Sequence, residues 1–333
     1  METVRVKDFM VAVDEQQEFD DADSSLGEDA VSSTASLNSS ILAYRNENGR
    51  TYHAFKEGRY HFPNDEQENE RLDLQHHIFY LTFDGKLGLA PPIEEKEKPL
   101  RVLDLGTGTG IWAMDYADEN PKAEVIGVDL SATQPQFVPP NVFFQIDDFE
   151  EDWTYSQKFD YIHSRMNNSS VVDWKRYIKQ AYDNLVPGGY LELQEFNLPL
   201  SDDNTLTPDT ALYKAMDLLG QAATIANHAF IDLGELRKIL IETGFEDVVE
   251  IKYKWPSNMW PKDKKHKEIG LWNGENVGSG LEGFLMAALT RALGWTKEEV
   301  DVLAAKARAD VKDRSIHAYW PVVVVYGRKP EKA

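Results

Sequence analysis

Short runs of apolar residues recur from residue 100 onwards, separated by polar stretches or by patterns of helical spacing. These runs predict seven strands, at residues 100–105, 124–129, 142–146, 159–163, 189–195, 247–254 and 316–327. Helical patterns lie between several of them, most clearly at 110–119 and 171–185. Because strands that alternate with helices form a mostly parallel sheet covered on both faces, the sequence predicts an α/β fold.

The first 99 residues contain two different segments. Residues 1–40 hold ten acidic residues against two basic ones, and such a segment buries too little apolar surface to offset its loss of conformational entropy. We interpret it as a disordered acidic tail that is either simply solvated or available to a protein partner. Residues 41–99 form an N-terminal helical segment that stops at Asp84-Gly85, followed by a Pro-rich linker. Residues 100–329 form the remaining domain.

Two helical insertions interrupt the later strands of that domain. The first, at about 200–230, contains Pro208, which is expected at the first position of a helix. The second, at about 257–313, contains a capping box formed by Thr296 and Glu299. Aromatic residues in and beside the second insertion predict a lid over a largely apolar substrate pocket.

Charge and composition exclude several classes of function. The 35 basic and 57 acidic residues leave a net charge of −22, which repels phosphate backbones and anionic lipid, so neither nucleic acid nor a membrane is an expected partner. The absence of cysteine excludes disulfides and thiolate catalysis. The adjacent His76 and His77 point to different helix faces, so no metal site is expected. With neither a secretory leader nor a membrane-spanning run, the expected location is the cytoplasm.

The sharpest local motif is VLDLGTGTG at residues 102–110, where a strand leads into a helix through a glycine-rich turn. Gly106, Gly108 and Gly110 line this turn, and the lack of a Cβ lets a ligand approach the backbone. A P-loop is excluded because no Gly-Lys-Ser/Thr follows. A dinucleotide fingerprint fails when counted from Gly106. Counted from Gly108 it ends on Ala113, a tolerated variant, so a nicotinamide-dependent oxidoreductase stays open.

Acidic residues mark the ends of three consecutive strands. Asp104 precedes the glycine turn, where a carboxylate suits an ammonium group such as that of S-adenosylmethionine (SAM) better than a pyrophosphate. Asp129 can accept hydrogen bonds from both hydroxyls of a ribose. Asp147 and Asp148 follow the third strand, where an acid can bind an adenine amino group while Phe149 packs on the ring. The alternative is that these two acids only cap a turn.

The segment VLDLGTGTGIWAMDYADENPKAEVIGVDLS resembles the first two motifs of class I SAM-dependent methyltransferases. The blocks RLDLQHH, QPQFVPPN, FDYIHSRM, AYDNLVPGGYLELQE and RSIHAYWPVVVVYGRKP are similar to the fungal LaeA-like methyltransferases of secondary metabolism, over roughly residues 41–329. The resemblance implies a Rossmann-like, seven-stranded, mostly parallel sheet whose reversed last strand lies between the fifth and sixth. It also implies SAM as cofactor.

Two functions are implied by the resemblance. The first is an enzyme that transfers a methyl group from SAM to O, N or S of a small, largely apolar metabolite. The second is a LaeA-like regulator of secondary metabolism that acts through protein partners, for which a nuclear location is expected instead.

Carried over to this chain, the resemblance places SAM along the strand ends, from its methionine end to its adenine. The implied residues are Asp104, Gly106, Gly108, Gly110, Asp129, Leu130, Asp147, Asp148 and Phe149. His163 is implied to lie beneath the cofactor. Tyr52 and Tyr60 are expected to fold back over it, or else to pack against helices.

Candidate general bases and substrate residues lie at the same sheet edge. The bases considered are His163, Glu195, His228 and His317, with His163 and Glu195 preferred because they end the fourth and fifth strands. A structural role is the alternative for His163. Residues expected to line the substrate pocket are Arg165, Met166, Trp255, Trp272, His317 and Tyr319. Packing in the core is the alternative for the aromatic ones.

Overall fold

The sheet expected from the sequence forms the centre of the protein. The computed structural model describes residues 44–56, 58–91 and 99–331. Its large sheet has the strand order β5-β4-β3-β6-β7-β9-β8, in which β9 is antiparallel to both neighbours and the other pairs are parallel. The reversed last strand thus lies between the fifth and sixth, which confirms the expected fold. The strands are β3 Arg101–Leu105, β4 Glu124–Asp129, β5 Val142–Ile146, β6 Phe159–Arg165, β7 Leu185–Phe196, β8 Glu246–Pro256 and β9 Tyr319–Arg328.

The helices begin and end at recognisable local signals. Asp65 caps the first turn of α1, and the chain leaves this helix through Asp84 and Gly85, which both have positive φ. The predicted capping box of Thr296 and Glu299 opens α7. The helices are α1 Glu66–Thr82, α2 Ile111–Glu119, α3 Trp174–Asn184, α4 Ala211–Ile225, α5 Leu233–Thr243, α6 Lys264–Leu293 and α7 Lys297–Lys312.

Some local predictions were wrong or incomplete. Pro208 is not the first residue of a helix, because α4 begins after Thr210, whose hydroxyl accepts the capping hydrogen bond. A hairpin of β1, Arg45–Glu47, and β2, Arg50–Tyr52, and the helix α5 were not anticipated. The acidic tail at residues 1–40 lies outside the described residues.

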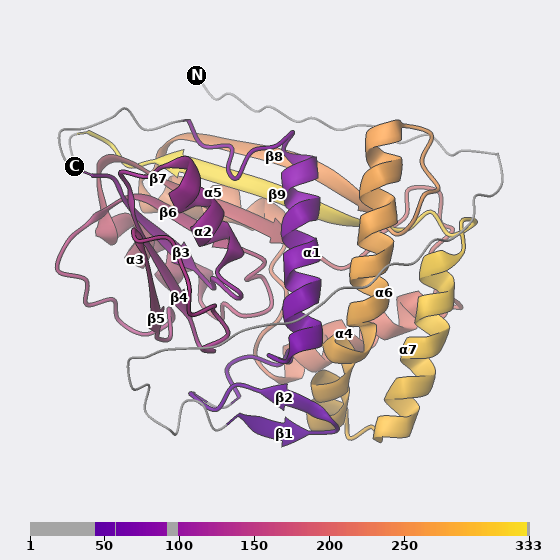
Figure 1. The fold of residues 1–333 in the computed structure, drawn as a ribbon. Coiled ribbons are helices and arrows are strands. Elements are labelled where there is room, and N and C mark those ends of the chain that lie inside the picture. The colour runs from indigo at the N-terminus through magenta and orange to yellow at the C-terminus, as the bar shows by residue number, and fades with distance from the viewer. Residues whose placement is uncertain (1–43, 57, 92–98, 332–333) are drawn as a thin grey trace.

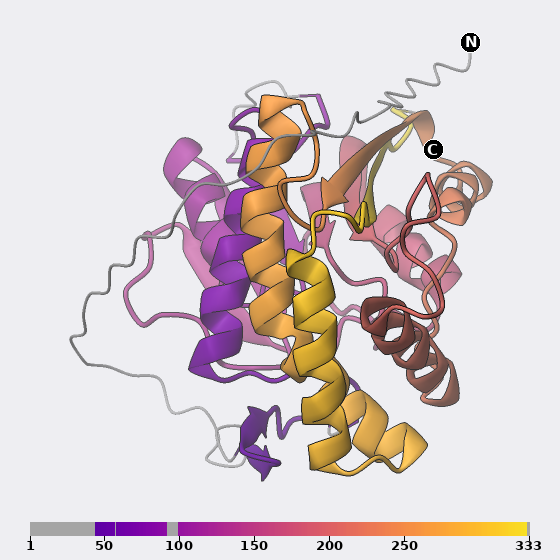
Figure 2. The same ribbon diagram turned by 90° about the vertical axis from the view of Figure 1, so that its right-hand side faces the viewer.

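Different helices cover the two faces of the sheet (Figures 1 and 2). The side chains of β9 show this alternation, since Val322 and Val324 pack into the core with α1, α4, α6 and α7. Val323 and Val325 belong to the core on the other face, with α3 and α5. In Figure 1, α1, α6 and α7 stand beside one another at one end of the sheet, so the predicted insertions build a helical layer there. No helix in the described ranges is both long and apolar enough to cross a membrane.

A buried ion pair within α1 is hydrogen-bonded to α6 in this helical layer. Arg71 donates two hydrogen bonds to the carboxylate of Glu68, at 2.7 and 3.0 Å, and a third to Oδ1 of Asn276 at 2.7 Å. The exposed fractions of Glu68 and Arg71 are only 2% and 6%. Each charge is therefore compensated by its partner rather than by water.

Replacing Glu68 with alanine is expected to lower the free energy of unfolding by about 2–3 kcal/mol, because Arg71 would stay buried with only Asn276 as polar partner. Urea denaturation measures the loss. The matched control is Asp183→Ala, which breaks an exposed ion pair with Lys179 and should cost less than about 1 kcal/mol. Similar losses of unfolding free energy in both variants would contradict the expectation that breaking a buried ion pair costs more than breaking an exposed one.

Candidate active site

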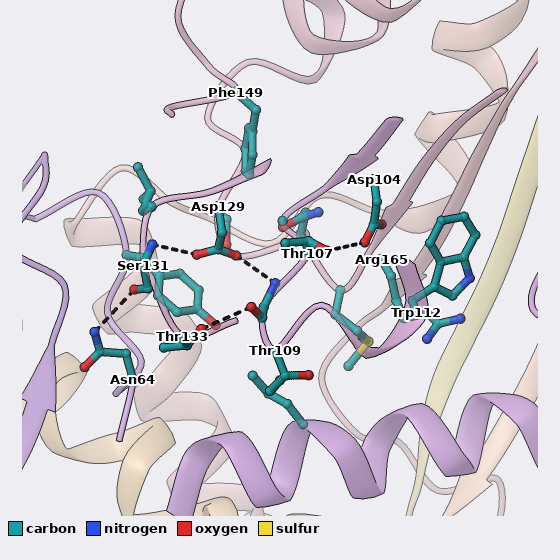
Figure 3. A pocket seen from close by; sticks show the side chains of 18 of the residues that line it. Asn64, Asp104, Thr107, Thr109, Trp112, Asp129, Ser131, Thr133, Phe149 and Arg165 are labelled. Carbon is teal, nitrogen blue, oxygen red and sulfur yellow. Dashed lines mark hydrogen bonds between the residues drawn. The ribbon is translucent and has the colours of Figure 1, made fainter. Parts of the chain in front are cut away.

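A cavity lies at the carboxyl ends of the central strands, with α1 as its opposite wall (Figure 3). This strand-end cavity occupies the edge where open α/β sheets bind ligands. It brings together many of the residues predicted from the sequence, namely Tyr60, Asp104, Gly106, Gly108, Asp129, Leu130, Asp148, Phe149, His163, Arg165 and Met166.

Asp129 holds two loops of the cavity together. Its Oδ2 accepts a hydrogen bond from the backbone N–H of Gly108, and its Oδ1 accepts one from that of Ser131, both at 2.9 Å (Figure 3). Burial raises the pKa of this carboxyl, and the two backbone hydrogen bonds oppose that shift by favouring the carboxylate. Because each carboxylate oxygen has two lone pairs, Asp129 can accept further hydrogen bonds from a ligand.

The three glycines of the turn have different roles, although all have positive φ. A Cβ on Gly106 would lie 2.6 Å from Oδ1 of Asn167, and one on Gly110 would lie 2.4 Å from the ring of Phe144. Both are therefore required by neighbouring side chains. Gly110 lies outside the lining of the cavity, and its contact with SAM stays a prediction. Of the three, Gly108 alone leaves room for a ligand. A Cβ added to it would meet only a methyl group of Leu72, at 3.4 Å.

Asp104 and His163 form a buried pair beneath the cavity. Oδ1 of Asp104 lies 2.7 Å from Nδ1 of His163, and its Oδ2 accepts a hydrogen bond from the hydroxyl of Thr107 at 2.6 Å. The imidazole stacks on Trp112, with ring centroids 3.7 Å apart. Since the carboxylate accepts, Nδ1 of a neutral His163 carries the hydrogen and Nε2 presents a lone pair. His163 thus fixes Asp104, and its use as a general base stays a prediction.

Of the two acids after β5, only Asp148 lines the strand-end cavity. Asp147 lies outside this lining and accepts a hydrogen bond from the backbone N–H of Asp148. Oδ1 of Asp148 accepts from the N–H of Glu150. Its Oδ2 is buried without a hydrogen-bond donor in the described residues and is 3.4 Å from the guanidinium of Arg59. Phe149 lies beside it in the lining.

A chain of polar groups along one wall was missed by the sequence analysis. Arg165 lies across the ring of Phe79 and reaches His76 at 3.1 Å, and His76 in turn contacts the carboxylate of Asp115 at 3.0 Å. Because arginine is always a donor, Nδ1 of His76 accepts and its Nε2–H donates to Asp115. Burial lowers the pKa of Arg165 to about 10. Leu72, Gln75 and His76 are spaced three and four residues apart, a pattern that already places them on one helix face.

An apolar cavity adjoins the strand-end cavity. The two share Tyr60, Leu72, Gln75 and Met166 in their linings. The apolar cavity extends between α1, α4 and α6, and it is otherwise lined by Phe62, Arg71, Phe196, Leu198, Met216, Leu219, Trp255, Asn273, Asn276, Val277, Phe284 and Trp320. The predicted substrate residues Met166 and Trp255 therefore lie here. Arg71, Gln75, Asn273 and Asn276 supply its polar groups.

Two aromatic residues expected near SAM or substrate lie elsewhere. Tyr52 in β2 packs beneath the guanidinium of Arg291, 4.7 Å from its ring centroid, because the unanticipated hairpin lies against α6. Trp272 is 36% exposed on α6 and contacts the ring of His77. Neither lines the strand-end or the apolar cavity, and the position of Tyr52 against α6 fits the helix-packing alternative.

His317 and Tyr319, at the start of β9, also lie outside these two cavities, although the next residue, Trp320, lines the apolar one. His317 pairs with Asp203, and the hydroxyl of Tyr319 donates to Asp202 at 2.7 Å. The strand does begin at the predicted edge of the sheet. The loop containing Asp202 and Asp203 covers it there, as the bridge between Leu200 and Tyr319 shows, and turns both side chains away from the site.

Glu195, one of the two preferred bases, lies on the other face of the sheet from the strand-end cavity, and its use as a base stays a prediction. It follows Leu191 and Leu193 on the face of β7 that packs against α3 and α5, whereas His163 lies on the α2 face. Its side chain is completely buried, and Oε2 accepts a hydrogen bond from the backbone N–H of Asn168 at 2.8 Å. Burial raises the pKa of Glu195 to about 8. It contributes to neither the strand-end nor the apolar cavity.

Comparison with known proteins assigns the family. The profile of the methyltransferase domain family matches residues 74–250, which is more than half of the chain. The chain belongs to this family. The resemblance found in the sequence is therefore confirmed, and with it the enzyme class, a methyltransferase that uses SAM.

The similar curated proteins are fungal. Methyltransferase pytC of Aspergillus terreus is 40% identical over 91% of this chain and 93% of its own length. Probable methyltransferase tdiE of Emericella nidulans is 38% identical over 79% of this chain and 82% of its own length. Protein-methionine methyltransferase laeA of the same species is 33% identical over 91% of this chain and 81% of its own length. Among solved structures, phosphoethanolamine N-methyltransferase 2 of Haemonchus contortus has 20% identity and a TM-score of 0.43, covering 79% of this chain and 52% of its own.

Proposed function

We propose that this methyltransferase transfers the methyl group of SAM to O, N or S of a small, largely apolar metabolite in fungal secondary metabolism. The observation that carries the proposal is the junction of the two cavities. Tyr60, Leu72, Gln75 and Met166 line both the strand-end cavity and the apolar cavity. A cofactor in the first and an acceptor in the second would meet at these four residues, and bringing reactants together is most of what methyl transfer requires.

The residues of the strand-end cavity fit SAM. Asp129 has lone pairs for ribose hydroxyls, and Gly108 leaves space beside the backbone. Oδ2 of Asp148 is buried with the guanidinium of Arg59 at 3.4 Å and without a hydrogen-bond donor among the described residues, which suits the amino group of adenine beside Phe149. Asp104 already binds His163 and Thr107 and would meet an ammonium group through its remaining lone pairs. When bound, SAM supplies an electrophilic methyl group.

The apolar cavity determines which acceptors fit. Met166, Trp255 and other apolar side chains exclude water, and Gln75 and Asn273 are among the few groups that can orient a polar atom of the acceptor. A small, mostly apolar molecule satisfies this lining better than a charged peptide. The cytoplasmic location expected from the sequence stays a prediction.

The alternative acceptor is a protein, since laeA of Emericella nidulans is named a protein-methionine methyltransferase. The two acceptors are separated by incubating the protein with SAM labelled in its methyl group and a fungal metabolite extract. We expect the label in the organic-soluble fraction. Label recovered only in protein would overturn the small-molecule proposal.

Leu198→Trp tests the location of the acceptor. This side chain lines the apolar cavity and not the strand-end cavity, so a larger ring should block the acceptor without changing SAM affinity. We expect at least a tenfold loss of methyl transfer. Leu200→Trp is the matched control, because Leu200 is 53% exposed two residues away. Equal activity of the two variants would remove the apolar cavity from the acceptor site.

A further inference from the structure

A third cavity lies beyond the apolar one and contains two histidines that the function proposed above does not use. This histidine cavity is formed by the loop after β2, the loop before α3, the end of α4 and the end of α6. It shares Phe62 and Leu219 with the apolar cavity, and Tyr60 is common to all three. Most of its remaining lining is apolar, including alanines of α4 and α6, so its polar atoms stand out.

His228 offers the cavity a hydrogen-bond acceptor. Its residue is only 5% exposed, and its Nδ1 is buried without a hydrogen-bond partner in the described part of the chain. Burial lowers the pKa of His228, and a hydrogen bond with the backbone of Ser170 opposes that shift by favouring the protonated ring. A backbone group that favours the protonated ring is a carbonyl acceptor, so the imidazole donates to it through its other nitrogen, Nε2. Nδ1 therefore carries a lone pair and requires a donor.

His61 adds two more buried polar atoms next to His228. The two rings meet edge to face, with centroids 5.3 Å apart, and both ring nitrogens of His61 are buried without a partner among the described residues. Burial lowers the pKa of His61 to about 4, so its imidazole is neutral at pH 7 and offers one donor and one acceptor. The hydroxyl of Ser169 lines the same cavity and is likewise buried without a partner.

The charge of the cavity argues against an anionic ligand. Arg291 is the cationic side chain in the lining, and its guanidinium is already bound to the carboxylate of Glu47 at 2.8 Å. Neutral histidines do not compensate a buried negative charge. An ionised carboxylate also has no hydrogen to donate to Nδ1 of His228. A hydroxyl or N–H group has one.

We propose that the histidine cavity binds the end of the methyl acceptor that lies farthest from the methylated atom, through a hydroxyl or N–H group that donates to Nδ1 of His228. Naming the acceptor as the occupant rests on the proposed function. Phe62 and Leu219 support it, because they line both the apolar and the histidine cavity, so the two cavities are direct neighbours. The acceptor is accordingly an elongated apolar molecule with a neutral donor at its distal end.

The test uses 4-phenylphenol as a neutral probe and biphenyl-4-carboxylate as its anionic counterpart, titrated by NMR into the full chain with SAM present. We expect saturable binding of the phenol, weakened about fivefold to tenfold in His228→Phe, which removes the acceptor of the phenol hydrogen. A similar loss is expected in His61→Phe, which removes the neighbouring N–H from which the phenol oxygen can accept. His77→Phe, which changes a histidine outside all three cavities, should bind the phenol like the unaltered protein. The carboxylate should bind more weakly than the phenol.

Phenol binding that is absent, or equal in all variants, overturns the proposal, as does tighter binding of the carboxylate. His61→Phe protects the test if His228→Phe does not fold, since His61 is the less buried of the two. SAM affinity measured on the same samples reports on the proposed function separately, because the histidine cavity shares only Tyr60 with the strand-end cavity. If the unaltered protein does not bind SAM, the proposed function is contradicted. The phenol affinities of the variants can still be compared with one another in that case.

Discussion

Replacing Asp129 with alanine is expected to weaken SAM binding about tenfold to a hundredfold. The carboxylate accepts hydrogen bonds from the backbone of Gly108 and Ser131 and is placed to accept those of a ribose as well. Its removal leaves two N–H groups of the loops and the ligand hydroxyls without their acceptor, and each such loss costs about 1–3 kcal/mol when the group is buried. Titration calorimetry with SAM measures the change.

The design needs a control for charge, because the variant also removes one of 57 acidic residues. Asp301→Ala does the same on the exposed face of α7, where Asp301 pairs with Lys297, and should leave SAM affinity unchanged. An Asp129→Ala protein that keeps full SAM affinity would exclude this carboxylate from the cofactor site. A melting temperature close to that of the control shows that the loops have not simply unfolded.

The contribution of Glu195 to the stability of the protein is expected to fall as the pH rises from 5 to 8, and Glu195→Gln should remove this contribution. The pKa of Glu195 is about 8 in the folded protein against an ordinary value of 4.5. Between these values the folded state binds one proton more than the unfolded state. The stabilisation is therefore fully present below pH 4.5 and is lost as the pH rises through 8, at roughly 1.4 kcal/mol per pH unit.

Urea denaturation of both proteins at pH 5, 6.5 and 8 measures the difference. Other carboxyl groups titrate in both, so the informative quantity is the stability of the unaltered protein minus that of the variant. It should decrease by roughly 3 kcal/mol or more across the series. A difference that stays constant with pH would mean that Glu195 is ionised in the folded protein, despite the complete burial of its side chain.

The sequence by itself determined the features that depend on short-range patterns. All seven strands of the sheet appear where apolar runs predicted them, because burial on both faces of a central strand such as β9 requires such runs. The positions of the glycine turn and of Asp129 at the ligand-binding edge of the sheet were predictable for a related reason. A strand that ends in a parallel sheet delivers its last residue to the common edge, whichever helices follow.

Only the tertiary structure decided how individual side chains are used. Alternation along β7 puts Glu195 on the opposite face from its neighbours, but only the packing of α3 and α5 shows that this face lies away from the cavity. Asp147 and Asp148 are equivalent in sequence, and the bend after β5 turns just one of them inwards. The histidine cavity combines segments from residue 60 to residue 292. Local patterns carry no information about distances between such segments, because those distances are set by the packing of the helical layer on the sheet.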